Sequence, residues 1–195
     1  ALLFDGEFIW VASSWGNSLT KVGLDGLVIR SFQVPGDHPS PWDLAFDGEF
    51  IWVASLGSSK VTKVDRDGTI VGSFQVTSLT IDPAIEGIDS AERGVFGSGP
   101  SAIVFDGEGI WVAVGVSNTV VKLATNGRRM GDFTVEGWPM GLLFDGESIW
   151  VTGYVDDIVT RLRLDGTALG SYPVERGPHV MTFDGDNVWV GNFEA

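Results

Sequence analysis

The chain has no cysteine, few basic residues and no long hydrophobic run. Its 195 residues contain 12 lysines and arginines against 26 aspartates and glutamates, and only two histidines. The absence of cysteine excludes disulfide scaffolds and thiolate metal sites. A formal net charge of −14 disfavours phosphate backbones, so we expect neither nucleic acid nor an anionic membrane as a partner. No apolar run approaches the roughly 18 residues of a membrane span, and the first residues lack the basic start of a signal peptide.

Glycine and tryptophan, by contrast, are abundant, with 27 and 8 copies. Both follow from an internal repeat. One motif occurs five times: it reads Phe-Asp-Gly, an acidic residue, a variable residue, Ile or Val, and then Trp-Val. Its phenylalanines are Phe4, Phe46, Phe105, Phe144 and Phe183. The spacings are 42, 59, 39 and 39 residues, and a period of roughly 40 is typical of the four-stranded blade of a β-propeller.

The repeat predicts an all-β fold, a β-propeller with four-stranded antiparallel blades. The first strand of the repeat at 41 covers Asp43–Phe46, and Asp47-Gly48 after it is interpreted as a two-residue type I′ turn. A second strand at Phe50–Ala54 and a third at Val61–Val64 precede an outer strand that carries Phe74. The second strand is apolar on both sides, so we expect both of its faces to be covered. The repeat tryptophans predicted for the core between blades are Trp10, Trp52, Trp111, Trp150 and Trp189.

The repeats predict a single β-propeller domain over residues 1–195. They also predict that the ring of blades is not closed. Full repeats start near residues 1, 41, 100 and 139, half a blade starts at 178, and an insertion covers 77–99. A bare strand edge is prone to pairing with other strands. We therefore expect the chain to be an excerpt of a longer propeller, or to self-associate or pair with another chain through the open blade edge.

The alternation of strands sorts the connections onto two faces. The turns between strands one and two and between strands three and four form a tight-turn face, which carries 13 of the 26 acidic residues. Turn chemistry explains these acids better than a cation site does. The loops between strands two and three and the linkers between blades form the opposite, loop face. Irregular residues gather there, and such residues usually carry function in scaffolds of this kind.

The candidate ligand-contact residues lie on the loop face. Four of the inner strands begin at a proline, and the residue after it varies from blade to blade; these prolines are Pro41, Pro100, Pro139 and Pro178. The candidates are Trp42, Asp43, His38, Ser101, Met140, His179 and Asn192. Alternatively, Trp42 and Met140 only plug the mouth of the channel, and His38 is a solvated loop residue. The insertion 77–99 emerges on the same face and is either functional or disordered.

The segment Pro41–Ala54, followed by Lys63-Val64 and Asp67-Gly68, resembles the repeats of the NHL, YncE-like and streptogramin (virginiamycin B) lyase group of propellers. The resemblance covers nearly the whole chain apart from the insertion. It implies the propeller fold and, because members often act outside the cytoplasm, an extracellular or periplasmic location. Members bind proteins, peptides or ligands, and a minority are enzymes.

The resemblance also implies a test for enzyme activity. Streptogramin lyases open a cyclic depsipeptide by elimination, with a magnesium ion and a His and Glu at the channel mouth. His179 after Pro178 matches the family's histidine. The positions of the family's glutamate hold no acid; they are Ser13, Ser55, Val114, Gly153 and Asn192.

The function favoured by the sequence is therefore a non-catalytic binding module without a cofactor, whose protein or small-molecule partner contacts the loop face. A magnesium-assisted lyase that uses His179 is the second hypothesis. A structural spacer within a larger secreted protein is the third.

Overall fold

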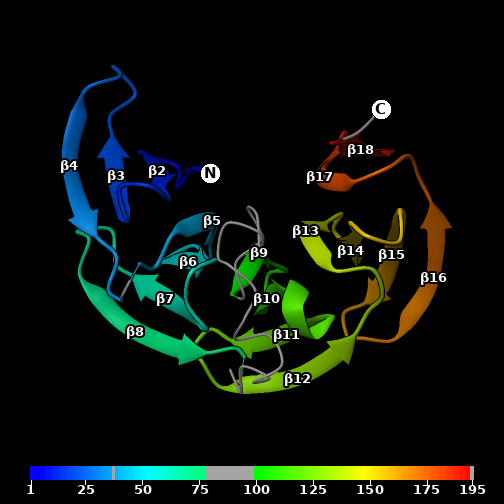
Figure 1. Cartoon of the computed structure of the whole chain (residues 1–195). Coiled ribbons are helices and arrows are strands. Elements are labelled where there is room, and N and C mark those ends of the chain that lie inside the picture. The colour runs from blue at the N-terminus through cyan, green and yellow to red at the C-terminus, as the bar shows by residue number, and fades with distance from the viewer. Residues whose placement is uncertain (37, 78–98, 194–195) are drawn as a thin grey trace.

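The fold is a set of antiparallel sheets arranged side by side as an open ring (Figure 1). The computed structural model describes residues 1–36, 38–77 and 99–193. Four sheets have four strands each and a fifth has two, in the orders β1–β4, β5–β8, β9–β12, β13–β16 and β17–β18. This confirms a β-propeller with four full blades and a partial one. Most of the predicted insertion 77–99 lies outside the described residues.

Each blade runs outward from the ring centre, and its strands follow one another in sequence. Blade 1 holds β1 (Leu2–Phe4), β2 (Ile9–Ser13), β3 (Ser18–Val22) and β4 (Val28–Gln33). Blade 2 holds β5 (Pro41–Phe46), β6 (Ile51–Ser55), β7 (Lys60–Val64) and β8 (Ile70–Gln75). Blade 3 holds β9 (Pro100–Phe105), β10 (Gly109–Val114), β11 (Thr119–Ala124) and β12 (Arg129–Thr134). Blade 4 holds β13 (Pro139–Phe144), β14 (Ser148–Gly153), β15 (Ile158–Arg163) and β16 (Ala168–Pro173), and blade 5 holds β17 (Pro178–Phe183) and β18 (Val188–Asn192).

Helical structure is minimal in the described part of the chain. A short 3-10 helix, Gly115–Ser117, follows β10. Within residues 1–36, 38–77 and 99–193 there is no helix of the length and apolarity that crossing a membrane requires.

The tight turn between the first and second strands differs from the predicted type I′ turn. In blade 2 the glycine Gly48 has φ +96, whereas Asp47 is not among the residues with positive φ. The Asp47 carboxylate instead accepts the N–H groups of Glu49 and Phe50 at 2.9 and 2.7 Å. The aspartate therefore caps the turn with its side chain, and only the glycine needs the left-handed conformation.

The repeat tryptophans form the core between blades only where a neighbouring blade covers them. Trp10, Trp52 and Trp111 have 0% of their surface exposed, which confirms the prediction for these three. Trp150 is partly buried. Trp189 is 60% exposed, so the prediction is wrong for blade 5. Val188 and Val190 on the same strand face a pocket shared with blade 4, and strand alternation turns Trp189 to the open side.

The inner strands position the loop face around the ring centre. β5 contacts β9, β9 contacts β13, and β13 contacts β17, so the first residues of these four strands share one end of the ring (Figure 1). Blade 1 and blade 5 are separated by a gap between their strands in the same view. The second residues of the four contacting strands are the blade-specific candidates Trp42, Ser101, Met140 and His179.

Candidate functional site on the loop face

The acids of the tight-turn face have structural partners. In blade 3, Asp106 accepts the N–H groups of Glu108 and Gly109 and the indole N–H of Trp111, the last at 2.7 Å. The Lys122 ammonium lies 2.8 Å from the same carboxylate and 4.7 Å from the centre of the Trp111 ring. We call this cluster the Asp–Trp–cation node. Burial raises the pKa of Asp106, but the hydrogen bonds from Lys122, Trp111 and the backbone outweigh it and hold the pKa below its usual value.

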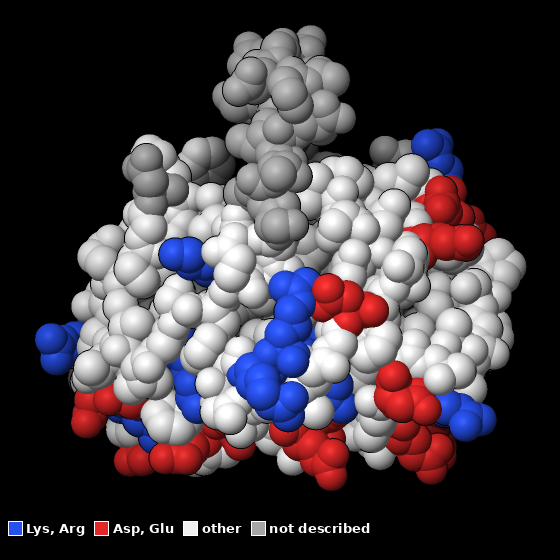
Figure 2. Space-filling model, turned by 90° about the horizontal axis from the view of Figure 1, so that it is seen from below, with Lys and Arg blue, Asp and Glu red and all other residues white. Residues whose placement is uncertain are grey.

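The Asp–Trp hydrogen bond and a cation over the tryptophan ring recur in the other four-stranded blades. The ion pair within the blade recurs in blades 2 and 4, at 3.8 and 3.7 Å, whereas Asp5 in blade 1 pairs with Arg66 of blade 2 at 4.0 Å. The residues at the same positions are Asp5, Trp10 and Lys21, then Asp47, Trp52 and Lys63, then Asp145, Trp150 and Arg161. Figure 2 shows Asp and Glu side chains gathered along one edge of the molecule. The aspartates that recur in these turns therefore cap the turns and orient the tryptophans. This structural role leaves the loop face as the candidate for a functional site.

The four predicted contact residues after the prolines differ in exposure. Ser101 and Met140 are each 2% exposed, whereas Trp42 and His179 are partly buried. The Ser101 hydroxyl donates to the Pro139 carbonyl of the next blade at 2.9 Å. Ser101 thus ties two inner strands together, and Trp42 and His179 are the two of this set with surface to offer a ligand.

Asp43 is a carboxylate in the wall of the ring centre. Its Oδ2 accepts the N–H of Ile103 from β9 at 2.9 Å, and its Oδ1 accepts its neighbour's N–H, that of Leu44, at 2.9 Å. Burial raises the pKa of Asp43 above its usual value, against these two hydrogen bonds. The corresponding positions of β9, β13 and β17 hold Ala102, Gly141 and Val180, and that of blade 1 is Ala1, so this acid is specific to blade 2.

The two histidines and Asn192 differ in burial. His179 is partly buried on β17, and burial lowers its pKa below 6.5. Its carbonyl oxygen packs against the backbone of Gly141 on β13, where a Cβ would lie 2.5 Å from it. His38 is exposed in the linker before β5 with φ +52, and Asn192 is exposed opposite Pro178.

The pairing of the first and second strands shows which side chains lie opposite the prolines that begin the inner strands. Ser55, Val114, Gly153 and Asn192 are paired with the strand-opening prolines of their blades, and these are the positions where the lyase resemblance places a glutamate. None carries a carboxylate. Among the described residues, no three His, Asp or Glu side chains are grouped to hold a metal ion. His179 is therefore the one residue of the lyase pattern that these positions supply within the part of the chain that the structure describes.

One buried polar group on this side of blade 2 stands out. Ser55 is 1% exposed, and its hydroxyl has no hydrogen-bond partner among the described residues. It is the last residue of β6 and is paired with Pro41.

The sequence did not indicate a set of exposed apolar residues on the loop face. Trp15, Val116 and Val155 occupy the second position of the loops β2–β3, β10–β11 and β14–β15, with exposed fractions of 101%, 41% and 64%. Five of the eight tryptophans in the chain belong to the repeat. The three others are Trp15, Trp42 and Trp138, and all three lie on this face. The sequence could therefore have indicated these three tryptophans as residues that the repeat does not explain.

The loop tips are fixed rather than loosely attached. Asn17, Asn118 and Asp157 at these tips have positive φ values of +50, +49 and +56. Their side-chain oxygens accept the N–H groups of Ser40, Trp138 and Gly177 in the linkers to the next blades, at 3.0, 3.0 and 2.9 Å. The linkers that lead to Pro41, Pro139 and Pro178 are therefore clipped to the loops beside the exposed apolar tips.

Comparisons with known proteins support the fold. No protein-family profile and no curated protein matches the sequence. Virginiamycin B lyase from Staphylococcus aureus is 21% identical, with a TM-score of 0.73 over 94% of this chain and 58% of that one. A streptogramin B lyase is 19% identical, with a TM-score of 0.77 over 97% and 60%. Hydrazine synthase from Kuenenia stuttgartiensis is 18% identical, with a TM-score of 0.68 over 91% and 48%.

These likenesses show that the chain has the propeller architecture of the streptogramin lyase group. The chain spans about 58–60% of the length of the two lyases. The same architecture also occurs in a protein named for hydrazine synthesis, so the fold does not by itself determine the activity.

Proposed function

We propose that this chain is a non-catalytic binding segment of a β-propeller, and that its loop face contacts a protein or small-molecule partner. The observation that carries the proposal is Trp15, which is 101% exposed at a loop tip. Val116 and Val155 occupy the same position on blades 3 and 4. Exposed tryptophans are costly in water and dominate the energetics of many interfaces, whereas the opposite face consists of repeated turns.

The partly buried residues beside the loops extend this surface. Trp42 begins the inner strand of blade 2, and Trp138 precedes the inner strand of blade 4. Trp138 has φ +60, an unfavourable conformation for a bulky residue. Its ring packs on Gly115, where a Cβ would lie 2.4 Å from the indole nitrogen. The surroundings thus hold the Trp138 ring in a set position on the loop face.

Affinity capture with matched variants tests the proposal. Immobilised wild-type protein, Trp15→Ala and Glu49→Ala are compared for proteins retained from a culture extract and for their affinities. Glu49 is exposed on the tight-turn face and is the control. We expect Trp15→Ala to weaken the partner at least tenfold, about 1.4 kcal/mol, while Glu49→Ala binds as wild type. A partner that both variants retain equally contradicts the assignment of the loop face.

The likeness to two lyases supports elimination of a cyclic depsipeptide as the second candidate. His179 is the one residue that matches, and no described carboxylate stands at the glutamate positions. The protein is incubated at high concentration with magnesium and a cyclic depsipeptide, and the products are followed by mass spectrometry. Ring opening that His179→Ala abolishes would replace the binding proposal by the lyase; an intact ring excludes that activity for this chain.

A further inference from the structure

The tight turn between the third and fourth strands of blade 3 differs from its counterparts in one residue. Blade 3 has Asn126 directly before the glycine of this turn. The other complete blades have an aspartate there, at Asp25, Asp67 and Asp165. Asn126 is exposed, and the glycine that follows it, Gly127, has φ +85. No other asparagine of the chain precedes a glycine.

An asparagine that precedes a glycine loses its side-chain amide without an enzyme. The backbone nitrogen of the glycine attacks the side-chain carbon Cγ and forms a five-membered imide ring. The amide nitrogen leaves as ammonia, together with the proton of the attacking N–H. Water then opens the ring at either carbonyl, so the product is aspartate or isoaspartate. In isoaspartate the main chain runs through the side-chain CH2 group, which makes it one atom longer.

The contacts of Asn126 arrange its side chain for this attack. Its Oδ1 accepts the N–H of Arg128 at 3.0 Å. Because this bond spans Gly127, it holds the side-chain amide beside the glycine nitrogen. It also places a donor on the oxygen that becomes negatively charged during the attack. The Gly127 N–H donates to the Ala124 carbonyl at 2.8 Å, and opening this bond in an exposed turn costs little.

The other asparagines and the equivalent aspartates lack this combination. Asn17 and Asn118 direct their side-chain oxygens to N–H groups of the linkers to the next blades. A carboxylate resists the attack because it is negatively charged. Hydrogen bonds from Thr167 lower the pKa of Asp165, so this aspartate is ionised at neutral pH. The residues that follow the other asparagines have a Cβ that hinders the attack, and they are Ser18, Thr119, Val188 and Phe193.

The turn at Asn126 also holds blade 3 against blade 2. The Lys63 ammonium donates to the carbonyl of Thr125, the residue before Asn126, at 2.7 Å. On the other side of Asn126, Gly127 lies against the Phe74 ring, and a Cβ at this glycine would overlap that ring. The bonds that change in isoaspartate therefore lie between two contacts with blade 2.

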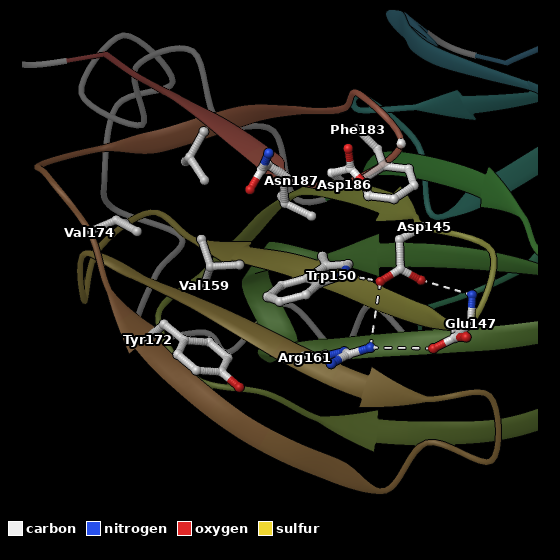
Figure 3. A pocket seen from close by; sticks show the side chains of 13 residues that line it. Asp145, Glu147, Trp150, Val159, Arg161, Tyr172, Val174, Phe183, Asp186 and Asn187 are labelled. Carbon is white, nitrogen blue, oxygen red and sulfur yellow. Dashed lines mark hydrogen bonds and ion pairs between the residues drawn. The ribbon is translucent and has the colours of Figure 1, made fainter.

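Both contacts reach the residues that cover Trp52. The rings of Phe74 and Trp52 stack with their centroids 5.4 Å apart, and the Lys63 ammonium lies 5.0 Å from the Trp52 ring. Figure 3 shows the equivalent arrangement of a cation and an aromatic ring around Trp150 of blade 4. A turn that is one backbone atom longer does not hold Lys63 and Phe74 in these positions together, whereas aspartate leaves the length of the turn unchanged.

We propose that Asn126 is the site at which this chain deamidates spontaneously, and that the isoaspartate product loosens the boundary between blades 2 and 3. Water is the co-reactant and ammonia is released. Aspartate, the other product, is the residue that the equivalent turns carry, and it leaves the boundary intact. The site lies on the tight-turn face, so the inference does not depend on the proposed function.

Ageing of the intact protein at mildly alkaline pH tests the reaction. The aged samples are digested, and mass spectrometry follows the exchange of NH2 for OH at each asparagine, while enzymatic methylation measures isoaspartate. We expect Asn126 to react at least about tenfold faster than any other asparagine, because it alone precedes a residue without a Cβ. Asn126→Gln is the matched control and should keep its amide, since its longer side chain would have to form a six-membered ring.

Two results of the ageing experiment would overturn the proposal. One is another asparagine that reacts as fast as Asn126 in the folded protein. The other is an Asn126 that keeps its amide in the folded protein and loses it in urea, because the turn would then protect the site.

Thermal unfolding of the separated products tests the effect on the boundary. Ion exchange isolates the deamidated protein, and hydrophobic-interaction chromatography resolves its isoaspartate and aspartate forms. Asn126→Asp has the charge of both forms and an unaltered main chain, so it is the control. We expect this variant to unfold with fresh wild type and the isoaspartate form to unfold roughly 2–4 °C lower. An isoaspartate form with the same Tm as Asn126→Asp would refute the loosening of the boundary.

Discussion

Replacing Asp106 by asparagine isolates the contribution of one Asp–Trp–cation node to stability. The asparagine oxygen can still accept the two turn N–H groups, but its NH2 group would face the Trp111 indole N–H and the Lys122 ammonium. Both are donors, so both lose their acceptor. The two side chains of the ion pair are 0% and 7% exposed, and removing one partner of a buried pair costs about 3–5 kcal/mol. Because Lys122 keeps the Leu164 carbonyl at 3.0 Å, we expect a loss of about 3 kcal/mol, the lower end of that range.

Urea and thermal unfolding of Asp106→Asn and Asp184→Asn, followed by circular dichroism, measure this difference. In a chain of this size, about 3 kcal/mol corresponds to a fall in Tm of roughly 6–12 °C. Asp184 accepts the same turn N–H groups but is exposed, and none of the described lysines and arginines forms an ion pair with it, so we expect a much smaller shift for its variant. Equal losses in the two variants would refute the view that burial and the lysine give the node its strength.

The same node predicts a pH dependence. The pKa of Asp106 is lower in the folded protein than in the unfolded chain, so its contribution is complete above the ordinary aspartate pKa of about 3.9. That contribution is lost as the pH falls below about 4 and through the lowered pKa. Wild type should therefore lose more stability than Asp106→Asn between about pH 5 and pH 2, and parallel curves would contradict this.

Two further predictions concern Trp52 and His179. Trp52→Ala should lower the free energy of unfolding by about 3–5 kcal/mol because the ring is fully buried, whereas Trp189→Ala should cost about 1 kcal/mol or less; urea titration of both variants measures the contrast, and equal costs would contradict the burial argument. The pKa of His179 is lowered by burial, so the unfolded chain binds a proton first and stability falls as the pH drops below about 6.5; NMR titration should give a midpoint under 6.5, and His179→Gln should flatten the stability curve between about pH 7 and pH 5.

The fold could be predicted from the sequence because each blade repeats the same local chemistry. The strand at Ile51–Ser55 and the turn at Asp47-Gly48 lie within a residue or so of the prediction. The turn type could not be predicted from the Asp-Gly pair alone. The Asp47 side chain captures Glu49, Phe50 and the Trp52 indole together, and the tryptophan becomes a partner only when the strand folds back.

The candidate site was less accessible to prediction because it depends on exposure rather than on residue type. Position after a proline placed Ser101 and Met140 at the right end of their strands, yet neighbouring blades bury both to 2%. Trp15 lies in a loop with no repeated motif, so its 101% exposure is apparent only in the folded structure. Trp189 has the same local sequence as the core tryptophans, and only the arrangement of whole blades distinguishes it.

Three lysine bonds between blades run in the same direction along the chain. Lys21, Lys63 and Lys122 each donate to a carbonyl in the following blade, at 2.8, 2.7 and 3.0 Å, so each blade completes the one made before it. During synthesis, a newly formed blade would find a finished template on its N-terminal side, and its own lysine would gain a carbonyl acceptor when the next blade emerges. Assembly from the N-terminus thus needs no long-range search, because each step closes contacts only with its immediate predecessor.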